Sequence, residues 1–94
     1  MDDDFEWDPK KAEKNRKKHR VSFADATGVF DDPEALGMEE EVVDGEEREV
    51  ILGMDNLGRL LVVVHTSSGR KIRLISARKA TKNEAREYER RIRF

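Results

Sequence analysis

The sequence contains no cysteine and only two histidines, His19 and His65. Without cysteine the chain can form neither a disulfide framework nor a thiolate metal site, and it has no thiol nucleophile. Two histidines are too few for a convincing metal cluster. We therefore expect no metal and no cofactor in this protein.

Long apolar segments and targeting signals are also missing. The longest apolar run, Leu60 to Val64, is far too short to span a bilayer, and no signal-peptide pattern opens the chain. These absences predict a cytoplasmic protein without membrane contact. The chain also has no linker, repeat or low-complexity run, so its length predicts a single domain over residues 1–94.

Charge is spread unevenly along the chain, although the net charge is only −2. Residues 31–49 hold ten acidic side chains against Arg48 alone, whereas residues 50–94 hold eleven basic side chains against four acidic ones. A basic half can bind polyanions even in an acidic protein, because local charge governs encounter within a Debye length of about 8 Å. The acidic segment either shields that surface, repels nucleic acid at one edge or binds a basic partner.

Hydrophobic periodicity and turn signals predict an α+β fold with the order β-α-α-β-β-β-β-α. Asp8-Pro9 indicates the start of a first helix that runs to about His19, and Ser22 caps a second, short helix. Strands are predicted at residues 5–7, 35–43, 46–54, 59–66 and 71–77, with Asp44-Gly45 as a hairpin turn. The sheet is expected to be antiparallel, with its last four strands forming a meander, two helices before the meander and one after it.

The last third of the chain carries the main candidate site. Alternation along the strand places two sets of side chains on opposite faces. The charged face is expected to carry Lys71, Arg73 and Ile75, and the core face Ile72, Leu74 and Ser76. Arg73, Ser76, Arg78 and Lys79 then gather where this strand meets the last helix. Arginine forks match phosphate oxygens, so this is a candidate phosphate site; the alternative is a solvated strand end.

The last helix begins with a capping box formed by Thr81 and Glu84. Ala85, Tyr88 and Ile92 follow at helical spacing, which predicts one inward face. We expect Tyr88 to be a core residue whose hydroxyl reaches the edge of the site.

The two histidines are candidates for proton transfer. If His65 falls on the same sheet face as Arg73, the guanidinium would lower the pKa of the imidazole and suit it to general acid–base chemistry. His19 shares a helix face with Asn15, four residues earlier, and there a structural role is the alternative to a catalytic one.

None of the familiar enzyme signatures occurs, neither a phosphate loop nor a nucleophile elbow nor a paired-histidine zinc motif. A chain of this composition can still cleave RNA without a metal, because the substrate supplies its own nucleophile, the 2′-hydroxyl. The protein then needs a base, an acid and cations for the charge that develops on the phosphate.

Several short motifs occur together in this chain. They are Phe5-Glu6-Trp7-Asp8-Pro9, Lys11-Ala12, Asn15, Lys18-His19, Val21-Ser22-Phe23, Gly45-Glu46 with Arg48, Leu61 to Val64, and Ile72 to Ala80 with Glu84 and Tyr88. This combination resembles the motifs of BrnT-type toxins. The resemblance covers nearly the whole chain. It implies a RelE-like fold and a ribonuclease toxin that stops translation. It also implies a BrnA-type antitoxin partner, with operator DNA bound only through that antitoxin.

On this basis we predict a metal-independent endoribonuclease that acts on RNA. Arg73 and Arg78 would hold the scissile phosphate, and His65, or else Lys18 with His19, would transfer protons, with Tyr88 at the edge of the site. Lys71, Ser76 and Lys79 are RNA-binding candidates. Arg48 is either a phosphate contact or a salt-bridge anchor.

Two departures from the family pattern affect these expectations. Arg20 stands where the family usually has glycine, which predicts a different cap at the end of the first helix. Ser67-Ser68 replaces an acidic and basic pair, which weakens the site if that pair contributes to it. The alternative function is a small non-catalytic module that binds nucleic acid or a protein partner.

Overall fold

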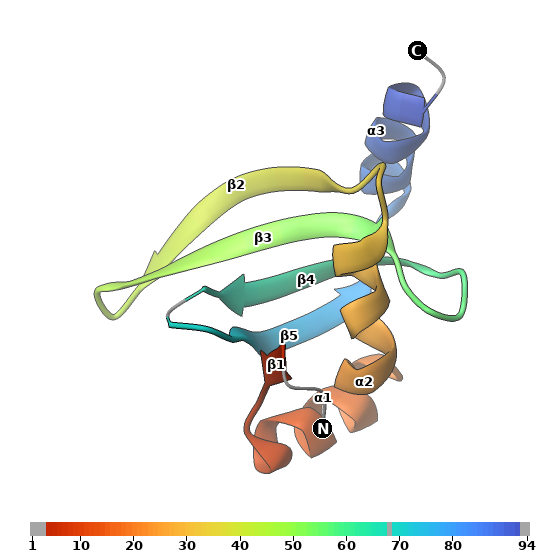
Figure 1. Cartoon of the computed structure of the whole chain (residues 1–94). Helices are drawn as coiled ribbons and strands as arrows, with labels where there is room; N and C mark the ends of the chain where they lie inside the picture. Colours follow the sequence, from red (N-terminus) through yellow and green to blue (C-terminus); the bar gives the residue numbers. More distant parts are fainter. Residues whose placement is uncertain (1–3, 68, 93–94) are drawn as a thin grey trace.

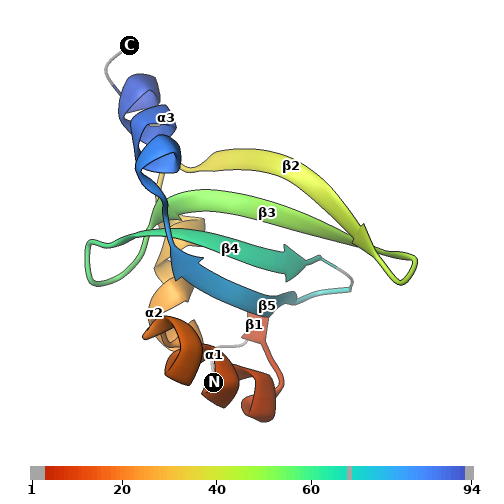
Figure 2. The same ribbon diagram turned by 180° about the vertical axis from the view of Figure 1, so that it is seen from behind.

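The computed structural model of the chain describes residues 4–67 and 69–92. Five strands form one sheet: β1 (Phe5–Glu6), β2 (Leu36–Val43), β3 (Glu46–Met54), β4 (Leu60–Thr66) and β5 (Ile72–Lys79). The helices are α1 (Pro9–His19), α2 (Phe23–Ala26) and α3 (Lys82–Ile92), with a 3₁₀ helix, η1 (Thr27–Asp31), directly after α2. Figures 1 and 2 show α1 and α2 beside β1 and β5, and α3 at one end of the sheet.

The sheet has the strand order β1-β5-β4-β3-β2. Strands β2 to β5 form the predicted antiparallel meander. The expectation of a wholly antiparallel sheet is wrong, because β1 pairs with β5 in parallel and makes the sheet mixed. The Ile72 N–H donates to the Asp4 carbonyl at 3.0 Å. A two-residue strand carries too short a pattern to reveal its direction.

The hairpin between β2 and β3 turns at the predicted Asp44-Gly45 pair. Asp44 has φ of 52° and Gly45 has φ of 78°. Two consecutive positive φ angles are those of a type I′ turn, which matches the twist of the flanking strands. The local sequence therefore set this turn by itself.

One face of the sheet is covered by α1, α2 and η1, and we call it the helix-covered face. Asp8 caps α1 by accepting from the Lys10 N–H at 2.9 Å, and Ser22 caps α2 as expected. A buried cluster joins α2 and η1 to β4 and β5; its members are Val21, Phe23, Ala26, Val29, Leu61, Val63, Leu74 and Ala77. The aromatic rings of Phe5 and Trp7 both pack against this cluster.

Asn15 joins α1 to β5. The residue is 7% exposed, and its side-chain N–H groups donate to the carbonyls of Val21 and Ala77, at 3.0 and 2.9 Å. Its oxygen accepts from the Ala77 N–H at 3.1 Å. All of these groups are buried and paired, which explains why a polar residue can face inward from a basic helix.

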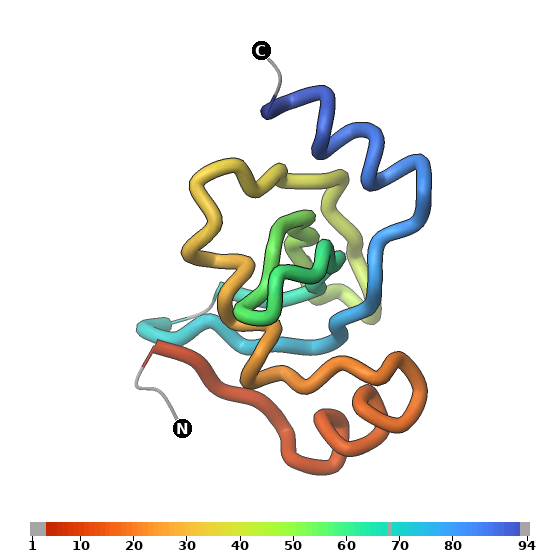
Figure 3. Tube along the Cα trace, turned by 90° about the vertical axis from the view of Figure 1, so that its right-hand side faces the viewer, coloured from red at the N-terminus to blue at the C-terminus, as the bar shows by residue number. Residues whose placement is uncertain are grey.

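The opposite face, which we call the open face, is covered only at one end, by α3. Its buried cluster consists of Val50, Leu52, Val62 and Tyr88. The prediction that Ile92 also faces inward is wrong, because its side chain is 50% exposed beyond the end of the sheet. In Figure 3 α3 and the N-terminal helices lie at opposite ends of the molecule, which leaves the rest of the open face uncovered by helices.

Candidate functional site

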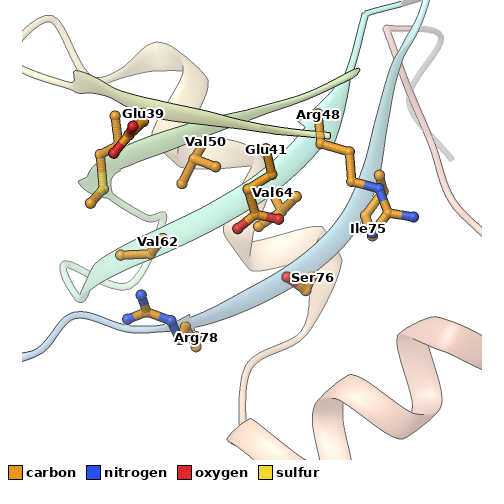
Figure 4. A pocket seen from close by; sticks show the side chains of 10 residues that line it. Glu39, Glu41, Arg48, Val50, Val62, Val64, Ile75, Ser76 and Arg78 are labelled. Atoms are coloured by element: carbon orange, nitrogen blue, oxygen red, sulfur yellow. The ribbon is translucent and has the colours of Figure 1, made fainter. Parts of the chain in front are cut away.

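The uncovered part of the open face forms a hollow of about 380 Å³. Its floor is apolar and its rim carries charges from β2, β3 and β5 (Figure 4). The lining residues are Met38, Glu39, Glu41, Arg48, Val50, Val62, Val64, Ile75, Ser76 and Arg78. Two of the predicted cations and the predicted serine therefore share one concave surface.

Arg78 is held in this hollow by Glu84. The two side chains form parallel hydrogen bonds, Nη1 to Oε1 at 2.8 Å and Nη2 to Oε2 at 2.9 Å. The Arg78 Nη1 also donates to the Lys79 carbonyl at 3.3 Å. These contacts occupy three of the five guanidinium N–H groups, so two stay available for an anion.

Glu84 reaches Arg78 because the predicted capping box is present. The Thr81 N–H donates to the Glu84 carboxylate at 2.8 Å, and the Glu84 N–H donates to the Thr81 hydroxyl at 3.2 Å. The hydrogen bonds from Arg78 and Thr81 outweigh burial and lower the pKa of Glu84 to about 2. The same contact raises the pKa of Arg78. The pair is therefore charged on both sides at neutral pH.

Ser76 enters the hollow because β5 has an irregular register. Leu74 pairs with His65 and Ser76 with Val64, so Ile75 is an extra residue between them. This β-bulge reverses the alternation, and the prediction that Ser76 shares the core face with Leu74 is wrong. Its hydroxyl makes no hydrogen bond to any residue that the structure describes.

Arg48 joins this hollow to a second one beside it. Its Nε donates to a Glu46 carboxylate oxygen at 3.2 Å, as expected for a salt-bridge anchor. Arg48 also lines both hollows. The second hollow is lined by Lys11, Val43, Asp44, Glu46, Arg48, Arg73 and Ile75. Arg73 is exposed and, within residues 4–67 and 69–92, makes neither an ion pair nor a side-chain hydrogen bond. Arg73 therefore lies on the predicted charged face, beside the first hollow.

His65 is separated from Arg73 by the sheet. It pairs with Leu74 on the helix-covered face, and its ring packs edge-on against Phe30 at 4.8 Å. Its Nε2 lies 3.4 Å from a Glu49 carboxylate oxygen, and its buried Nδ1 has no hydrogen-bond partner. His65 and Arg73 therefore do not share a sheet face, and the predicted effect of Arg73 on the His65 imidazole depended on such a shared face.

The remaining predicted cations lie away from the two hollows. Lys18 is exposed and His19 half-buried in the last turn of α1, on the helix-covered side. Lys79 is exposed and pairs with Leu61, so it lies on the face opposite Arg78. Lys71 is half-buried just before β5 and lines neither hollow. Arg20 caps α1 in the left-handed conformation, φ of 61°, where glycine would be unstrained.

Comparison with known proteins identifies the family of this chain. A family model described as "Ribonuclease toxin, BrnT, of type II toxin-antitoxin system" matches residues 7–84. The chain belongs to the BrnT toxin family. Among solved structures it is similar to the Brucella abortus ribonuclease toxin BrnT, with a TM-score of 0.65 and 24% identity over 84% of this chain and 97% of that one. This second likeness shows a shared fold. A comparison with curated proteins gives no match.

Tyr88 of this BrnT-family chain is a core residue, as predicted. Its hydroxyl donates to an Asp32 carboxylate oxygen at 2.7 Å, and burial together with this bond raises the pKa of Tyr88 to about 12. Burial alone would raise the pKa of Asp32, but hydrogen bonds from the Met54 N–H and from Tyr88 lower it. The hydroxyl therefore ties α3 to the segment before β2, and Tyr88 does not line the hollow.

The sequence reasoning missed the two acidic residues of the hollow, Glu39 and Glu41. They stand in a run of three glutamates, and nothing local distinguishes the one that faces the cations. Ser67 borders a different part of the surface with His65, and Ser68 lies outside the described residues. Across the described residues, no group of three or more metal-binding side chains occurs, and no helix is long and apolar enough to cross a membrane.

Proposed function

We propose that this BrnT-family protein is an endoribonuclease toxin that cleaves RNA without a metal ion and thereby stops translation in the cytoplasm. The observation that supports this most is the hollow of the open face, where Arg48, Arg78 and Ser76 surround an apolar floor. Guanidinium forks and a free hydroxyl suit a phosphodiester, and the apolar floor suits the faces of bases.

The proposed roles follow from where the cations lie. Arg78 in the first hollow and Arg73 in the second hold the scissile phosphate between them and stabilise the charge that grows on it as the 2′-oxygen attacks. Arg48 and Ser76 contact the neighbouring RNA backbone. Lys71 and Lys79 lie outside both hollows and add only long-range attraction for RNA. Proton transfer by Lys18, His19 or His65 stays a separate proposal, because none of the three lines the hollow.

The fold supports a RelE-like assignment, which we also propose. A four-stranded antiparallel meander follows two N-terminal helices and leads into one C-terminal helix. Membership of a type II toxin–antitoxin family implies a protein antitoxin. We propose that it is of the BrnA type, that it neutralises the toxin, and that operator DNA is bound only through it.

The proposal is tested with purified protein and end-labelled single-stranded RNA in excess chelator. We expect cleavage to persist, and expression of the chain alone to arrest growth. RNA that is shifted in a gel but stays intact would favour the non-catalytic binding module. Cleavage that disappears on chelation and returns with magnesium would contradict the metal-free mechanism and point to acidic ligands such as Asp31, Asp32 or Glu34.

A further inference from the structure

Two β-bulges flank the hollow, and each changes which side chains enter it. The first, in β5, adds Ile75 and sends Ser76 and Arg78 to the open face. The second is in the edge strand β2, where the pairing shifts from Met38–Val50 to Glu41–Arg48. Bulges occur preferentially beside active sites, where they redirect a side chain. Here two strands from opposite sides of the sheet bring residues to the same place.

The bulge in β2 decides which glutamate meets the cations. Regular alternation from Met38 would place Glu40 opposite Arg48 on the open face. Because two residues, Glu39 and Glu40, stand opposite Glu49 alone, Glu41 takes that position instead. Glu40 borders a separate hollow with Phe30 and His65. Two adjacent glutamates on one strand thus face different surfaces.

Glu41 projects into the hollow, and Figure 4 shows its carboxylate between Arg48 and Arg78. The charged groups that face it are Arg48 on β3, Arg78 on β5 and Glu39 on its own strand, while β4 contributes the apolar Val62 and Val64. Within the described residues the Glu41 carboxylate makes no hydrogen bond and no ion pair at contact distance, and it interacts with the charge of Arg78 only through space. Its oxygens are therefore free to accept a proton from a bound molecule.

We propose that Glu41 is the general base of the RNA cleavage, an inference that rests on the ribonuclease function proposed above. Its carboxylate accepts the proton of the 2′-hydroxyl. The 2′-oxygen forms a bond to the adjacent phosphorus, and the bond from phosphorus to the 5′-oxygen breaks. The leaving 5′-oxygen takes a proton from water, and Glu41 returns its proton to solvent. The products are a 2′,3′-cyclic phosphate and a 5′-hydroxyl.

The sharpest test compares Glu41→Gln with Glu40→Gln. Both variants remove one negative charge from the same exposed stretch of β2, and only the first alters the hollow. Glu41→Gln is expected to lower the cleavage rate by about 10²–10⁴-fold, the usual contribution of a general base. Binding of an RNA with a 2′-O-methyl group at the cleavage position should stay the same or tighten, because a charge that repels phosphate is lost. Glu40→Gln should cleave like the parent protein.

The pH profile gives a second readout. The parent rate should fall in acid, because a protonated base cannot accept the 2′-hydroxyl proton, and the residual rate of Glu41→Gln should lack that acid limb. If the parent cleaves RNA and Glu41→Gln cleaves equally well, the role of Glu41 is overturned and the ribonuclease function stands. If the parent leaves every RNA intact, both proposals are overturned.

Discussion

Arg78 and Glu84 face each other across the junction of β5 and α3, joined by two parallel hydrogen bonds of 2.8 and 2.9 Å. The same carboxylate accepts the Thr81 N–H and so closes the first turn of α3. One glutamate therefore both orients a candidate phosphate-binding arginine and begins the helix that covers one end of the open face.

This relationship predicts a loss of stability in acid. The pKa of Glu84 is lowered from 4.5 to about 2 in the folded protein, so its contribution is complete above about pH 4.5 and is lost as the pH falls towards 2. Because the Arg78 side chain is 40% exposed, solvent screening reduces this contribution to about 1 kcal/mol.

Glu84→Gln should therefore lose about 1 kcal/mol of unfolding free energy at pH 7 and show a smaller further loss between pH 4.5 and 2. Chemical denaturation at several pH values measures this. Glu87→Gln, further along α3 in an exposed pair with Arg90, is the control. Parallel pH curves for the parent and Glu84→Gln would contradict the prediction.

Arg73→Ala should separate activity from folding. Its guanidinium is exposed and contacts no acidic group in the described part of the chain, so the melting temperature should not change. The cleavage rate should fall about 10²–10³-fold, because a cation that faces the growing phosphate charge is lost. Lys14→Ala, on the exposed side of α1, removes the same charge away from both hollows and should leave the rate nearly unchanged. Equal rates for Arg73→Ala and the parent would remove Arg73 from the site.

Arg78→Ala should affect both properties. The carboxylate of Glu84 would lose its two charged donors, so we expect a lower melting temperature together with a lost cleavage activity. Loss of activity without loss of stability is therefore expected for Arg73→Ala and not for Arg78→Ala. Arg78→Lys tests whether the two parallel hydrogen bonds of the guanidinium are needed, since lysine keeps the charge but cannot form both of them. Full activity of that variant would show that charge alone suffices.

Arg20→Gly should stabilise the protein. Arg20 adopts φ of 61°, and the left-handed conformation costs a residue other than glycine about 1–2 kcal/mol. Glycine also enlarges the freedom of the unfolded chain, so the net gain should be near 1 kcal/mol. The contact of Arg59 with Arg20 uses the Arg20 carbonyl and survives the change. His19→Gly, one residue earlier inside the helix, should instead lower the free energy of unfolding by roughly a few tenths of a kcal/mol, because glycine is the weaker helix former.

Asn15→Ala should be among the most damaging single changes outside the apolar core. It leaves the buried carbonyls of Val21 and Ala77 and the buried Ala77 N–H without their partner. We expect a loss of about 2–4 kcal/mol of unfolding free energy, because each unpaired buried polar group carries a penalty. Asn15→Asp should also destabilise, since a carboxylate can accept from Ala77 but cannot donate to either carbonyl. A variant as stable as the parent would contradict the role of this amide.

The sequence by itself determined the local elements of this protein. Asp8-Pro9, Ser22, Asp44-Gly45 and the Thr81–Glu84 box each act within a few residues, and the structure confirms all four. The alternation of Arg73 and Leu74 between the faces could be read from strand periodicity for the same reason.

Only the tertiary structure decided which side chains meet. The bulges at Ile75 and at Glu39-Glu40 arise from the register between neighbouring strands, and a shift of one residue moves every later side chain to the other face. For this reason alternation misplaced Ser76, and the local pattern could not distinguish Glu41 from Glu40. The parallel direction of β1 likewise depends on how the chain returns beside β5. Register and strand direction are properties of pairs of distant segments, and no local pattern in a single sequence contains them.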